Sequence, residues 1–415
     1  MIQKRILMLA WEYPPHIVGG LARVVWAISR ELVRNDCEVH VITADHPGTP
    51  EYEVDEAGVH VHRVKSQTDS SGQSWHIPNF ALWDARLNFG MLQHAIRLHQ
   101  EKPFDIVHAH DWLVADAAWV LKSFGLPLVS TIHATEYGRN NGIHNAESHY
   151  IDQVEWRLIY ESAKVIVNSQ HMLVELNEHF HVPTEKVTVI PNGIEPDKLL
   201  STEEPAELRR QHRIGSGPVL LFVGRLVYEK GIQVLLSAMP RILERYPDTT
   251  LIIAGAGGYE QHLRDQARQA GIGQRVRFFG KANDADLRQL YAMANAVVVP
   301  SLYEPFGIVA LEGMAAKVPV VVSDAGGLRD IVRHEHNGVT TYAGNSDSLA
   351  WGVLHCLSNP ELSARLKEQA RQTVLEQFTW EAIAARTLDV YEEVLAAPST
   401  SNLLQLPTAA EETAA

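Results

Sequence analysis

Short apolar runs alternate along this chain with longer stretches whose apolar residues recur every three or four positions. The run RILMLAW at 5–11 is followed by LARVVWAISRELVRN at 21–35, in which the apolar residues fall on one helical face. Continuous apolar runs are typical of strands buried in a parallel sheet, whereas the three-to-four spacing is typical of an amphipathic helix. Further strands in the first half of the chain are predicted at 38–44, 104–110, 127–133 and 164–169. This pattern predicts a doubly wound α/β domain.

The alternation is interrupted at 186–218, where prolines and turn-forming dipeptides accumulate. This segment contains Pro191, Asn192-Gly193, Pro196, Pro205 and the sequence GSGP at 215–218. Such a composition predicts a crossover between domains. The alternation then resumes, and it predicts strands at 219–225, 249–255, 276–280, 296–300 and 318–324. The chain is therefore expected to form two Rossmann-like domains, with a ligand cleft between them.

The end of the chain departs from this pattern. The sequence TWEAIAARTLDVYEEVL at 379–395 predicts a helix that Thr379 caps. The residues after it are of low complexity, and we expect a disordered tail at 398–415. These boundaries give a first domain at 1–190, a second domain at 191–378 and a C-terminal helix at 379–397.

The composition fits two globular domains and excludes several classes of protein. A chain of 415 residues, of which 46% are hydrophobic, can fill two cores of ordinary size. The net charge of -14 argues against a nucleic-acid-binding protein, which would present a basic surface. The chain has no apolar stretch of about 18 residues, so we expect no integral membrane segment. The N-terminal sequence MIQKRILMLAWEYPPH lacks the apolar core and cleavage site of a signal peptide and is interpreted as a first strand.

Cysteine is rare in this chain. Cys37 and Cys356 are the two cysteines, and no CxxC pair occurs. We therefore expect neither a disulfide framework nor a structural zinc site. A cytoplasmic location fits this cysteine usage.

Rossmann-like domains often bind dinucleotides, but the glycine pattern argues against that function here. In EYPPHIVGG at 12–20 the glycines come at the end of a loop that is too long for the tight turn of GxGxxG. The sequence GAGGYE at 255–260 begins as that motif, but Glu260 stands where the third glycine should be. No GxxxxGK[ST] occurs either, so a P-loop protein is unsupported.

Two glutamates stand eight positions apart in the segment LYEPFGIVALEGMA at 302–315. Glu304 and Glu312 do not fit a glycosidase pair, whose carboxylates are roughly 5–9.5 Å apart, because on one helix they would be about 12 Å apart along the axis. Pro305 and Gly307 predict instead that Glu304 lies in a loop and that a helix begins near residue 306, with Glu312 two turns in. The N-terminus of that helix would offer N–H groups to an anion or a sugar oxygen. The plain alternative is a solvent-facing helix residue and a first-turn acid.

Two cations and a glycine pair add phosphate-binding character. Arg225 ends a predicted strand, and Lys230 follows five residues later in VGRLVYEKG. Cations at the C-terminal edge of a parallel sheet suit a phosphate-bearing ligand. Gly19 and Gly20 precede a predicted helix and would let backbone N–H groups approach an anion closely. Taken singly, each feature could also be a surface charge or a flexible loop.

Histidines and an aspartate follow two predicted strands of the first domain. The stretches HAHDW and STIHATEYGRN follow these strands. They contain four residues that are expected near the strand ends, namely His108, His110, Asp111 and His133. An HxH pair without a third ligand at a recognisable spacing is weak evidence for zinc. A single histidine is more often a core or surface residue. His133 and Asp111 stand out because both fall at the same edge of the predicted sheet.

Together these motifs resemble the retaining glycosyltransferases of family 4, which have the GT-B fold. The motifs that carry the resemblance are GG-L at 19–21, IPNGIE at 190–195, GRLVYEKG at 224–231 and EPFGIVALE at 304–312, which fits the family's E-x7-E. The resemblance covers about residues 4–395, and HAHDW, HATEYGR and WEYPP..VGGLA are closest to the glycogen and starch synthases. It implies that the two domains face each other across a cleft, the first on the acceptor side and the second binding the nucleotide-sugar. It also implies that the C-terminal helix returns to the first domain.

The resemblance implies a donor-binding site for the nucleotide-sugar. Its residues would be Gly19, Gly20, Arg225, Lys230, Glu304, Phe306, Gly307, Ile308 and Glu312. Arg225 and Lys230 would clamp the donor diphosphate and stabilise charge on the leaving group, while Glu312 would hydrogen-bond the ribose hydroxyls. Glu304 and the backbone that follows it would hold the donor sugar, and the glycine pair would lie against the phosphates.

The resemblance also implies a catalytic set. Its members would be His133, Asp111, Glu304, Arg225 and Lys230. His133 and Asp111 would contact the sugar near the reacting carbon. Because Arg225 and Lys230 can stabilise the departing diphosphate, no metal ion and no other cofactor is expected.

The preferred interpretation is a transferase that moves glucose from ADP-glucose or UDP-glucose to an α-glucan. Glycogen synthases usually carry a lysine where this chain has Ile17, so the nucleotide is left open. One alternative is a family 4 glycosyltransferase with a small-molecule or lipid acceptor; a lipid acceptor would predict a basic surface helix, whereas 85–102 is interpreted as a packed helix. The E-x7-E and the Arg/Lys pair favour transfer over a nucleotide-sugar epimerase, and the complete motif set argues against a catalytically silent sugar-binding protein. The oligomeric state is not predicted.

Overall fold

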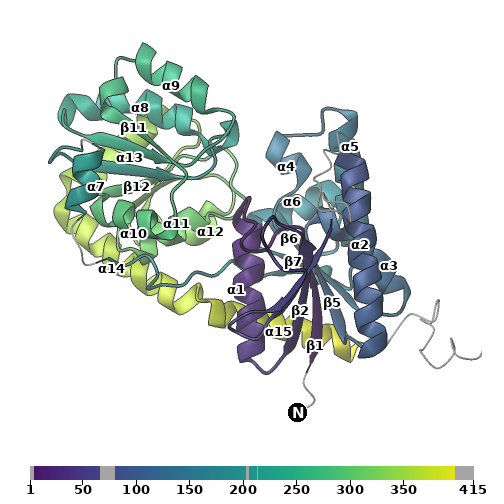
Figure 1. Ribbon diagram of the computed structural model, residues 1–415. Coiled ribbons are helices and arrows are strands. Elements are labelled where there is room, and N and C mark those ends of the chain that lie inside the picture. Colours follow the sequence, from purple (N-terminus) through teal and green to yellow (C-terminus); the bar gives the residue numbers. More distant parts are fainter. Residues whose placement is uncertain (1–3, 66–79, 202–204, 213, 398–415) are drawn as a thin grey trace, which may run out of the picture. The chain divides into compact units, whose positions relative to one another are not determined.

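The computed structural model describes residues 4–65, 80–201, 205–212 and 214–397. It divides into two compact units (Figure 1). Unit 1 comprises Met1–Pro191 and Trp380–Ala415, and unit 2 comprises Asn192–Thr379. The predicted tail at 398–415 lies outside the described residues.

Unit 1 is built on an eight-stranded sheet. Its strands are β1 Arg5–Leu9, β2 Glu38–Ala44, β3 Tyr52–Val54, β4 His60–Val64, β5 Ile106–His110, β6 Leu128–Ile132, β7 Lys164–Val167 and β8 Val187–Val189. Their order is β3-β4-β2-β1-β5-β6-β7-β8, and every pairing is parallel except that of β3 with β4. The strand order reverses between β1 and β5, and open α/β sheets bind ligands at the carboxyl ends of the strands at such a reversal.

Helices cover both faces of this sheet. The helices of unit 1 are α1 Gly20–Arg34, α2 Phe80–Glu101, α3 Ala115–Ser123, α4 Glu136–Asn140, α5 Ala146–Glu161, α6 Gln170–Phe180 and α15 Trp380–Ala396, with short 3-10 turns at Trp112–Val114 and Thr184–Lys186. Figure 1 shows α1 on one side of the sheet and α2 and α3 on the other. Strands β1, β5 and β6 are buried along their whole length, as expected for strands covered on both faces.

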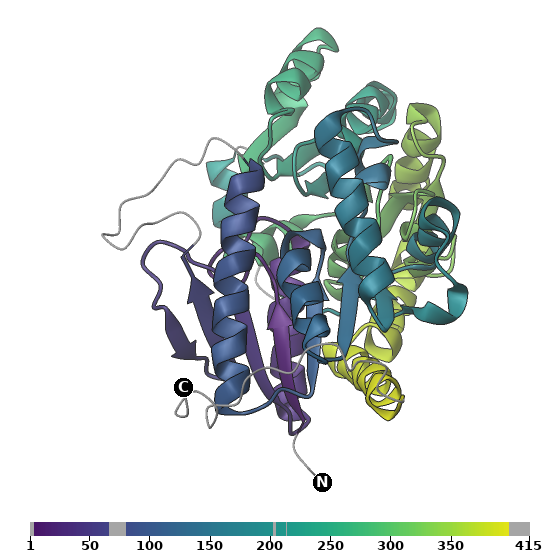
Figure 2. The same cartoon turned by 90° about the vertical axis from the view of Figure 1, so that its right-hand side faces the viewer.

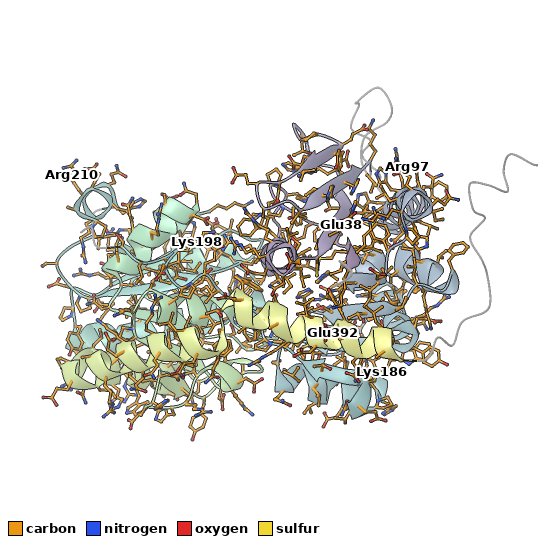
Figure 3. The ribbon with its side chains drawn as sticks, turned by 90° about the horizontal axis from the view of Figure 1, so that it is seen from below. Glu38, Arg97, Lys186, Lys198, Arg210 and Glu392 are labelled. Atoms are coloured by element: carbon orange, nitrogen blue, oxygen red, sulfur yellow. The ribbon has the colours of Figure 1, made fainter. Side chains whose placement is uncertain are left out.

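The C-terminal helix α15 packs in unit 1, as the sequence predicted. It contacts α1, and the fully buried Tyr391 places its hydroxyl oxygen 2.7 Å from Nδ1 of His108 on β5. At its exposed edge Glu392 pairs with Lys4 at 2.8 Å (Figure 3). The helix therefore completes the first unit although it follows the second in the sequence.

Helix α2 bears on the question of a lipid acceptor. The sequence predicts a packed helix at 85–102, and α2 confirms this, because it buries Leu87, Met91, Ala95 and Leu98 in the core of unit 1. Figure 2 shows α2 lying across the sheet. Within the described part of the chain, no helix is both long enough and apolar enough to span a membrane.

Unit 2 is built on a six-stranded parallel sheet. Its strands are β9 Val219–Val223, β10 Thr250–Ala254, β11 Val276–Gly280, β12 Ala296–Val299, β13 Val320–Ser323 and β14 Val339–Thr341. Their order is β11-β10-β9-β12-β13-β14, so the strand order reverses between β9 and β12. The helices are α7 Ala206–Gln211, α8 Ile232–Arg245, α9 Glu260–Gln269, α10 Asp284–Met293, α11 Ile308–Ala315, α12 Leu328–Ile331, α13 Ser346–Ser358 and α14 Pro360–Gln377, with 3-10 turns at Tyr228–Lys230 and Gly273–Arg275. Both units thus have the predicted doubly wound architecture.

A buried ion-pair network ties β1 to β2 in unit 1. The Arg5 guanidinium donates to the Glu38 carboxylate at 2.6 Å, and Lys102 contacts the other oxygen of Glu38. Burial alone would raise the Glu38 pKa, but hydrogen bonds from Lys102, Arg5 and His40 outweigh it and bring the pKa to about 2. Because this pKa lies below the ordinary value of 4.5, the carboxylate stabilises the fold at neutral pH, and that stabilisation is lost as the pH falls from about 4.5 toward 2.

Replacing Glu38 by glutamine is expected to lower the free energy of unfolding of unit 1 by about 1–3 kcal/mol at neutral pH, because Arg5 is buried and loses its charged acceptor. Urea titrations at several pH values measure the difference, which should shrink below about pH 4.5. Glu392→Gln is the control, since Glu392 is 63% exposed and its pair with Lys4 contributes at most about 1 kcal/mol (Figure 3). Equal losses in the two variants, or a Glu38→Gln loss that persists undiminished in acid, would contradict this interpretation.

Candidate active site

Lys230 and Glu304 meet at the strand reversal of unit 2. Lys230 ends the turn that follows β9, and Glu304 lies in the loop that follows β12, the neighbouring strand. The Lys230 Nζ atom is 2.8 Å from Oε2 of Glu304, and their side chains are only 19% and 13% exposed. The Ser301 hydroxyl donates to the same carboxylate oxygen at 3.0 Å. The ammonium group is therefore held in a fixed position, which is what pre-organised stabilisation of a departing anion requires.

Gly231 allows these two loops to approach each other. Its φ is +69°, and a Cβ atom at this position would lie 1.9 Å from the carbonyl oxygen of Pro300. The loops are also joined by a hydrogen bond from the Leu302 N–H to the Glu229 carbonyl at 2.8 Å. The glycine after Lys230 is thus required by the close packing that brings Lys230 to Glu304.

Helix α11 starts later than the sequence predicted. The helix begins at Ile308 rather than near residue 306, because Gly307 has a φ of +116° and is the N-cap. Glu312 therefore lies one turn into the helix, and the prediction of two turns is wrong. The Phe306 side chain is buried, so this residue can offer a ligand only its backbone. The Ala310 N–H donates to the Gly307 carbonyl at 2.9 Å. The N–H groups of Ile308 and Val309 are therefore the ones that this helix end can offer to an anion or a sugar oxygen.

Glu312 is a buried carboxylate and not a solvent-facing one. Glu312 is only 6% exposed, and its Oε2 atom accepts a hydrogen bond from the Tyr291 hydroxyl at 2.7 Å. Tyr291 is itself fully buried on α10. A buried carboxylate is costly unless it is hydrogen-bonded, so the plain alternative for this residue does not hold. The ribose contact stays a prediction.

Arg225 is held differently from Lys230. Its side chain is 55% exposed, and its guanidinium lies 3.7 Å from the carboxylate of Glu229. Such an exposed pair is weak and leaves the side chain able to reorient. Arg225 could therefore turn toward an anion, whereas Lys230 is already in place.

In unit 1 the glycine pair lies beside the buried carboxylate of Glu12, which the sequence pattern did not identify. Gly19 is the N-cap of α1 and Gly20 is its first residue. Glu12, which is 2% exposed, accepts hydrogen bonds from the N–H groups of Gly19 at 3.1 Å and Ala22 at 3.3 Å, and also from Val18. Burial raises the pKa of Glu12, and these hydrogen bonds partly oppose the rise.

This arrangement changes what the glycine pair can offer to a phosphate. The sequence predicts that the Gly19 N–H approaches the anion, but this group already donates to Glu12. The N–H groups of the helix end that do not donate to Glu12 are therefore the ones that can bind a phosphate. The position of the glycine pair against the phosphates stays a prediction. The signal that the sequence offered was a lone acidic residue directly after an apolar run, which is too common to interpret alone.

Asp111 and His133 lie together, at the ends of β5 and β6. Asp111 has a φ of +61°, unusual for a residue other than glycine, and its Oδ1 accepts the N–H of His133 at 2.7 Å. Sparsely populated backbone conformations cluster at functional sites. The predicted neighbourhood of these two residues is present, and Asp111 fixes the backbone of His133 rather than its ring.

The histidine rings beside Asp111 are neutral at physiological pH. Nε2 of His133 is 3.2 Å from Nδ1 of His110, and the two rings stack. Burial lowers the pKa of His133, and the charge of Asp111 only partly opposes this. His108 is saturated, since its nitrogens lie 2.7 Å from the hydroxyls of Tyr391 and Thr131. His110 has a buried Nε2 without a partner among the described residues, but it is only 1% exposed. His133 is partly exposed, so its ring is the one of this group that a ligand can reach.

Carboxylates that could suggest a metal site have structural roles instead. Asp284 and Asp286 form a DAD triplet, but Asp286 accepts the N–H of Asn283 at 3.1 Å as part of a capping box, and Asp284 pairs with Lys198 at 2.9 Å. Among the described residues, no three His, Cys, Asp or Glu side chains are placed to hold one metal ion. Chemistry without a metal stays a prediction.

Comparisons with known proteins agree with this fold. Residues 18–198 match the family model described as Glycosyltransferase Family 4, and residues 205–373 match the model described as Glycosyl transferases group 1. The chain is 42% identical over 393 residues to an uncharacterized glycosyltransferase of Methanocaldococcus jannaschii, covering 94% of this chain and 98% of that protein. It is 37% identical over 401 residues to a glycogen synthase of Mycobacterium tuberculosis, covering 93% and 94% of the two chains.

More distant relatives extend this picture. A D-inositol 3-phosphate glycosyltransferase of Thermobispora bispora is 31% identical over 72% of each chain. The solved sucrose-phosphate synthase of Thermosynechococcus elongatus has a TM-score of 0.81 at 24% identity, over 95% of this chain and all of that one. The fold and the matched domains define a glycosyltransferase with the GT-B fold. The chain belongs to glycosyltransferase family 4.

Proposed function

We propose that this protein is a retaining glycosyltransferase that moves glucose from ADP-glucose or UDP-glucose to an α-glucan. The observation that carries the proposal is the Lys230–Glu304 pair at the strand reversal of unit 2, with the N-terminus of α11 directly after it. A fixed cation and free N–H groups suit a diphosphate leaving group, and the adjoining carboxylate suits sugar hydroxyls. The glucan acceptor is supported by the relative described as a glycogen synthase, which matches over nearly the whole chain.

In the proposed reaction the bond between the anomeric carbon and the diphosphate oxygen breaks as an acceptor hydroxyl attacks the same face of the sugar. The proton of that hydroxyl passes to the departing phosphate oxygen. Because the acceptor attacks the sugar directly, no residue of the protein forms a covalent bond with it. Negative charge develops on the diphosphate. The ammonium group of Lys230, which is held by its hydrogen bond to Glu304, stabilises that charge. Arg225 adds a second cation by reorienting from the surface.

The remaining residues position the donor. Glu312 is proposed to hold the ribose, and the α11 end with Gly307 and Ile308 to hold phosphate or sugar oxygens. His133 is proposed to donate a hydrogen bond to the donor sugar, with Asp111 fixing its backbone. Because the pKa of His133 is lowered, its ring would serve as a neutral donor and not as a cation.

His133→Ala is expected to lower kcat by about tenfold to hundredfold, the loss of one hydrogen bond to a charged transition state. The donor KM should change less than kcat, because the contact strengthens as the bond breaks. Because burial lowers the pKa of His133, titration of this ring should not change kcat between about pH 7 and pH 8. Steady-state kinetics across pH measure both effects.

His355→Ala is the matched control for His133, since His355 lies on α13, pairs with Glu335 and is not among the predicted site residues. It should leave both kcat and KM near the wild-type values. An unchanged kcat in His133→Ala would remove His133 from the site.

A second candidate is transfer to a small acceptor. It is favoured by Ile17, which stands where glycogen synthases usually carry a lysine, and by the relative described as a D-inositol 3-phosphate glycosyltransferase. This candidate keeps the donor site and the mechanism in full. It differs only in which hydroxyl attacks.

A panel of donors and acceptors tests the proposal. Purified protein is incubated with ADP-glucose, UDP-glucose, GDP-mannose or UDP-N-acetylglucosamine, each with glycogen or with a pool of small acceptors, and released nucleoside diphosphate is followed. Parallel reactions with EDTA test the expected independence from metal. Release that requires both glycogen and a glucose donor is the expected result. Release only with a small acceptor would establish the second candidate instead.

A further inference from the structure

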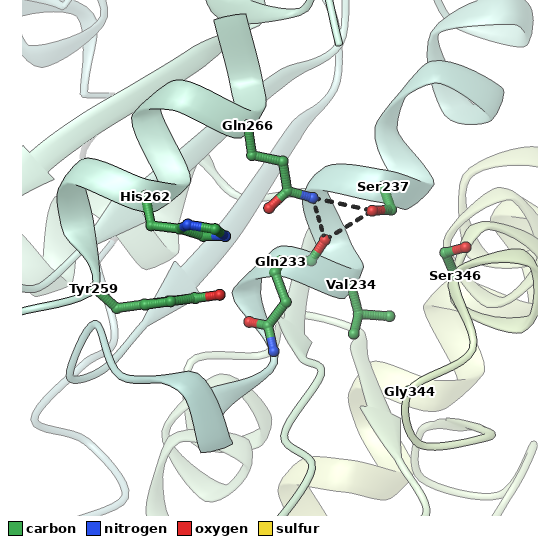
Figure 4. Close-up of a pocket in the computed structure, with 8 residues that line it drawn as sticks. All are labelled: Gln233, Val234, Ser237, Tyr259, His262, Gln266, Gly344 and Ser346. Atoms are coloured by element: carbon green, nitrogen blue, oxygen red, sulfur yellow. Dashed lines mark hydrogen bonds between the residues drawn. The ribbon is translucent and has the colours of Figure 1, made fainter. Parts of the chain in front are cut away.

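Unit 2 has a pocket whose lining includes none of the residues predicted for the donor site. Its volume is about 280 Å³, and it lies where the first turns of α8 and α9 meet the loop before α13 (Figure 4). The side chains that matter for its chemistry are Gln233, Ser237, Tyr259, His262, Gln266 and Ser346. Pockets for drug-sized ligands are usually about 300–1,000 Å³, so this one suits a compact ligand or one end of a longer one.

The pocket has an aromatic wall and a polar wall. The rings of Tyr259 and His262 stack with centroids 4.5 Å apart and planes 21° apart, so each covers a face of the other, and Figure 4 shows the Tyr259 hydroxyl directed toward Gln233. Opposite them are amide and hydroxyl groups, and no lysine, arginine, aspartate or glutamate lines the space. An anion would find no counter-charge here, and an aliphatic ligand would find few apolar partners. A neutral polyol with C–H faces matches both walls.

The amide groups of the polar wall have unused hydrogen-bonding capacity. The Gln266 amide nitrogen donates to the Ser237 hydroxyl at 3.0 Å and to the Gln233 carbonyl at 2.8 Å, and Figure 4 shows its oxygen turned to the opposite side, toward His262. Within the described residues, the side-chain oxygens of Gln233 and Gln266 are both buried without a donor. Buried acceptors of this kind are uncommon in folded proteins. Small rotations of the two amides would let them accept hydrogen bonds from the hydroxyls of a ligand.

We propose that this pocket binds a neutral saccharide and, resting on the proposed function, that it holds a segment of the α-glucan acceptor apart from the transfer site. The Tyr259 hydroxyl and the edges of the stacked Tyr259 and His262 rings contact the sugar, and Gln233, Gln266 and the serine hydroxyls bind its hydroxyl groups. A long glucan then gains affinity from a second point of attachment, whereas a short acceptor does not.

Gln233 connects this pocket to the turn Tyr228–Lys230, which carries a predicted donor-site residue. Its amide nitrogen donates to the carbonyl of Tyr228 at 3.0 Å, in the 3-10 turn that ends at Lys230. A saccharide that engages the Gln233 amide would therefore act on one end of the segment that carries Lys230. The Tyr259 ring also meets this turn, since it lies edge-on to the ring of Tyr228 with centroids 6.0 Å apart. The kinetic part of the test therefore uses His262→Ala, and Tyr259→Ala serves for saccharide binding alone.

The test measures maltoheptaose binding by calorimetry and glucan kinetics on the full chain. Tyr259→Ala and His262→Ala are compared with the wild type and with Tyr246→Ala, a tyrosine at the opposite end of α8. Each wall variant should lose one binding step for maltoheptaose, or weaken it by about tenfold or more, and Tyr246→Ala should not. The KM for glycogen should rise by a similar factor in His262→Ala, while its kcat with a short maltose acceptor stays unchanged.

Several results would overturn the proposal. Unchanged maltoheptaose binding in both wall variants would do so, and so would inorganic phosphate or glucose 6-phosphate displacing maltoheptaose from this step, since either would indicate an anion site. The calorimetry does not depend on turnover. If the protein transfers no glucose to glycogen but the wall variants still lose saccharide binding, then the proposed function fails and the pocket assignment stands.

Discussion

Replacing Lys230 by alanine is expected to lower the turnover number of sugar transfer by about 10²–10³-fold, as removal of one pre-organised donor typically does. The reason is geometric, because the Lys230 ammonium is already fixed on Glu304 and needs no reorganisation when the diphosphate leaves. Lys230→Met should behave in the same way, since it keeps the aliphatic stem but not the charge. Donor KM should change less than kcat if the charge on the leaving group is what Lys230 stabilises.

Lys198→Ala is the matched control for Lys230→Ala. Lys198 also pairs with a carboxylate of unit 2, Asp284 at 2.9 Å, but its side chain is 41% exposed and it lies outside the predicted site (Figure 3). Steady-state kinetics should find the control near wild type, and circular dichroism should show that every variant is folded. Near-normal turnover in both Lys230 variants would remove Lys230 from the catalytic set.

Replacing Glu304 by alanine is expected to reduce transfer by a comparable factor of about 10²–10³. Two losses combine in this variant, the proposed contact with the donor sugar and the anchor that holds Lys230 and the Ser301 hydroxyl. Because Glu304 and Lys230 act as one unit, the double variant should be little worse than either single one. Comparison of kcat/KM for the single and double variants measures this coupling.

Glu368→Ala is the control for Glu304→Ala, since Glu368 pairs with Lys317 on the surface of unit 2 and is 69% exposed. It should leave transfer unchanged. Additive losses in the double variant would show that the two residues act independently, and wild-type activity in Glu304→Ala would refute its assignment.

The architecture could be predicted from the sequence wherever strands are buried on both faces. The runs that form β1, β12 and β13 are almost continuously apolar, and burial of the whole strand follows from that pattern. The sequence does not predict β3, β4, β8 or β14, which are short or mixed in character, and β8 lies within the segment 186–218 that is predicted as a crossover. β3 has three residues and an exposed Tyr52, and β4 reads HVHRV, so neither shows a continuous apolar run.

The candidate site was predictable to the extent that sheet order determines which loops meet. Lys230 and Glu304 are 74 residues apart in the chain, yet they adjoin because β9 and β12 are neighbours at the reversal of the strand order. The sequence could not show that Glu312 is buried on Tyr291, because helical position alone does not tell which face the rest of the chain covers. Glu12 was missed for a related reason, since its role depends on how the following loop folds back onto it.

The most direct test of glucan synthesis at the Lys230 site is the incorporation of radiolabelled glucose from ADP-glucose and UDP-glucose into glycogen, by the wild-type protein and by Lys230→Ala. We expect label in precipitable polymer from at least one donor, its release by α-amylase, and a loss of about 10²-fold or more in the variant. Label that never enters the polymer from either donor, or that enters equally well with Lys230→Ala, would contradict the proposed function and its mechanism.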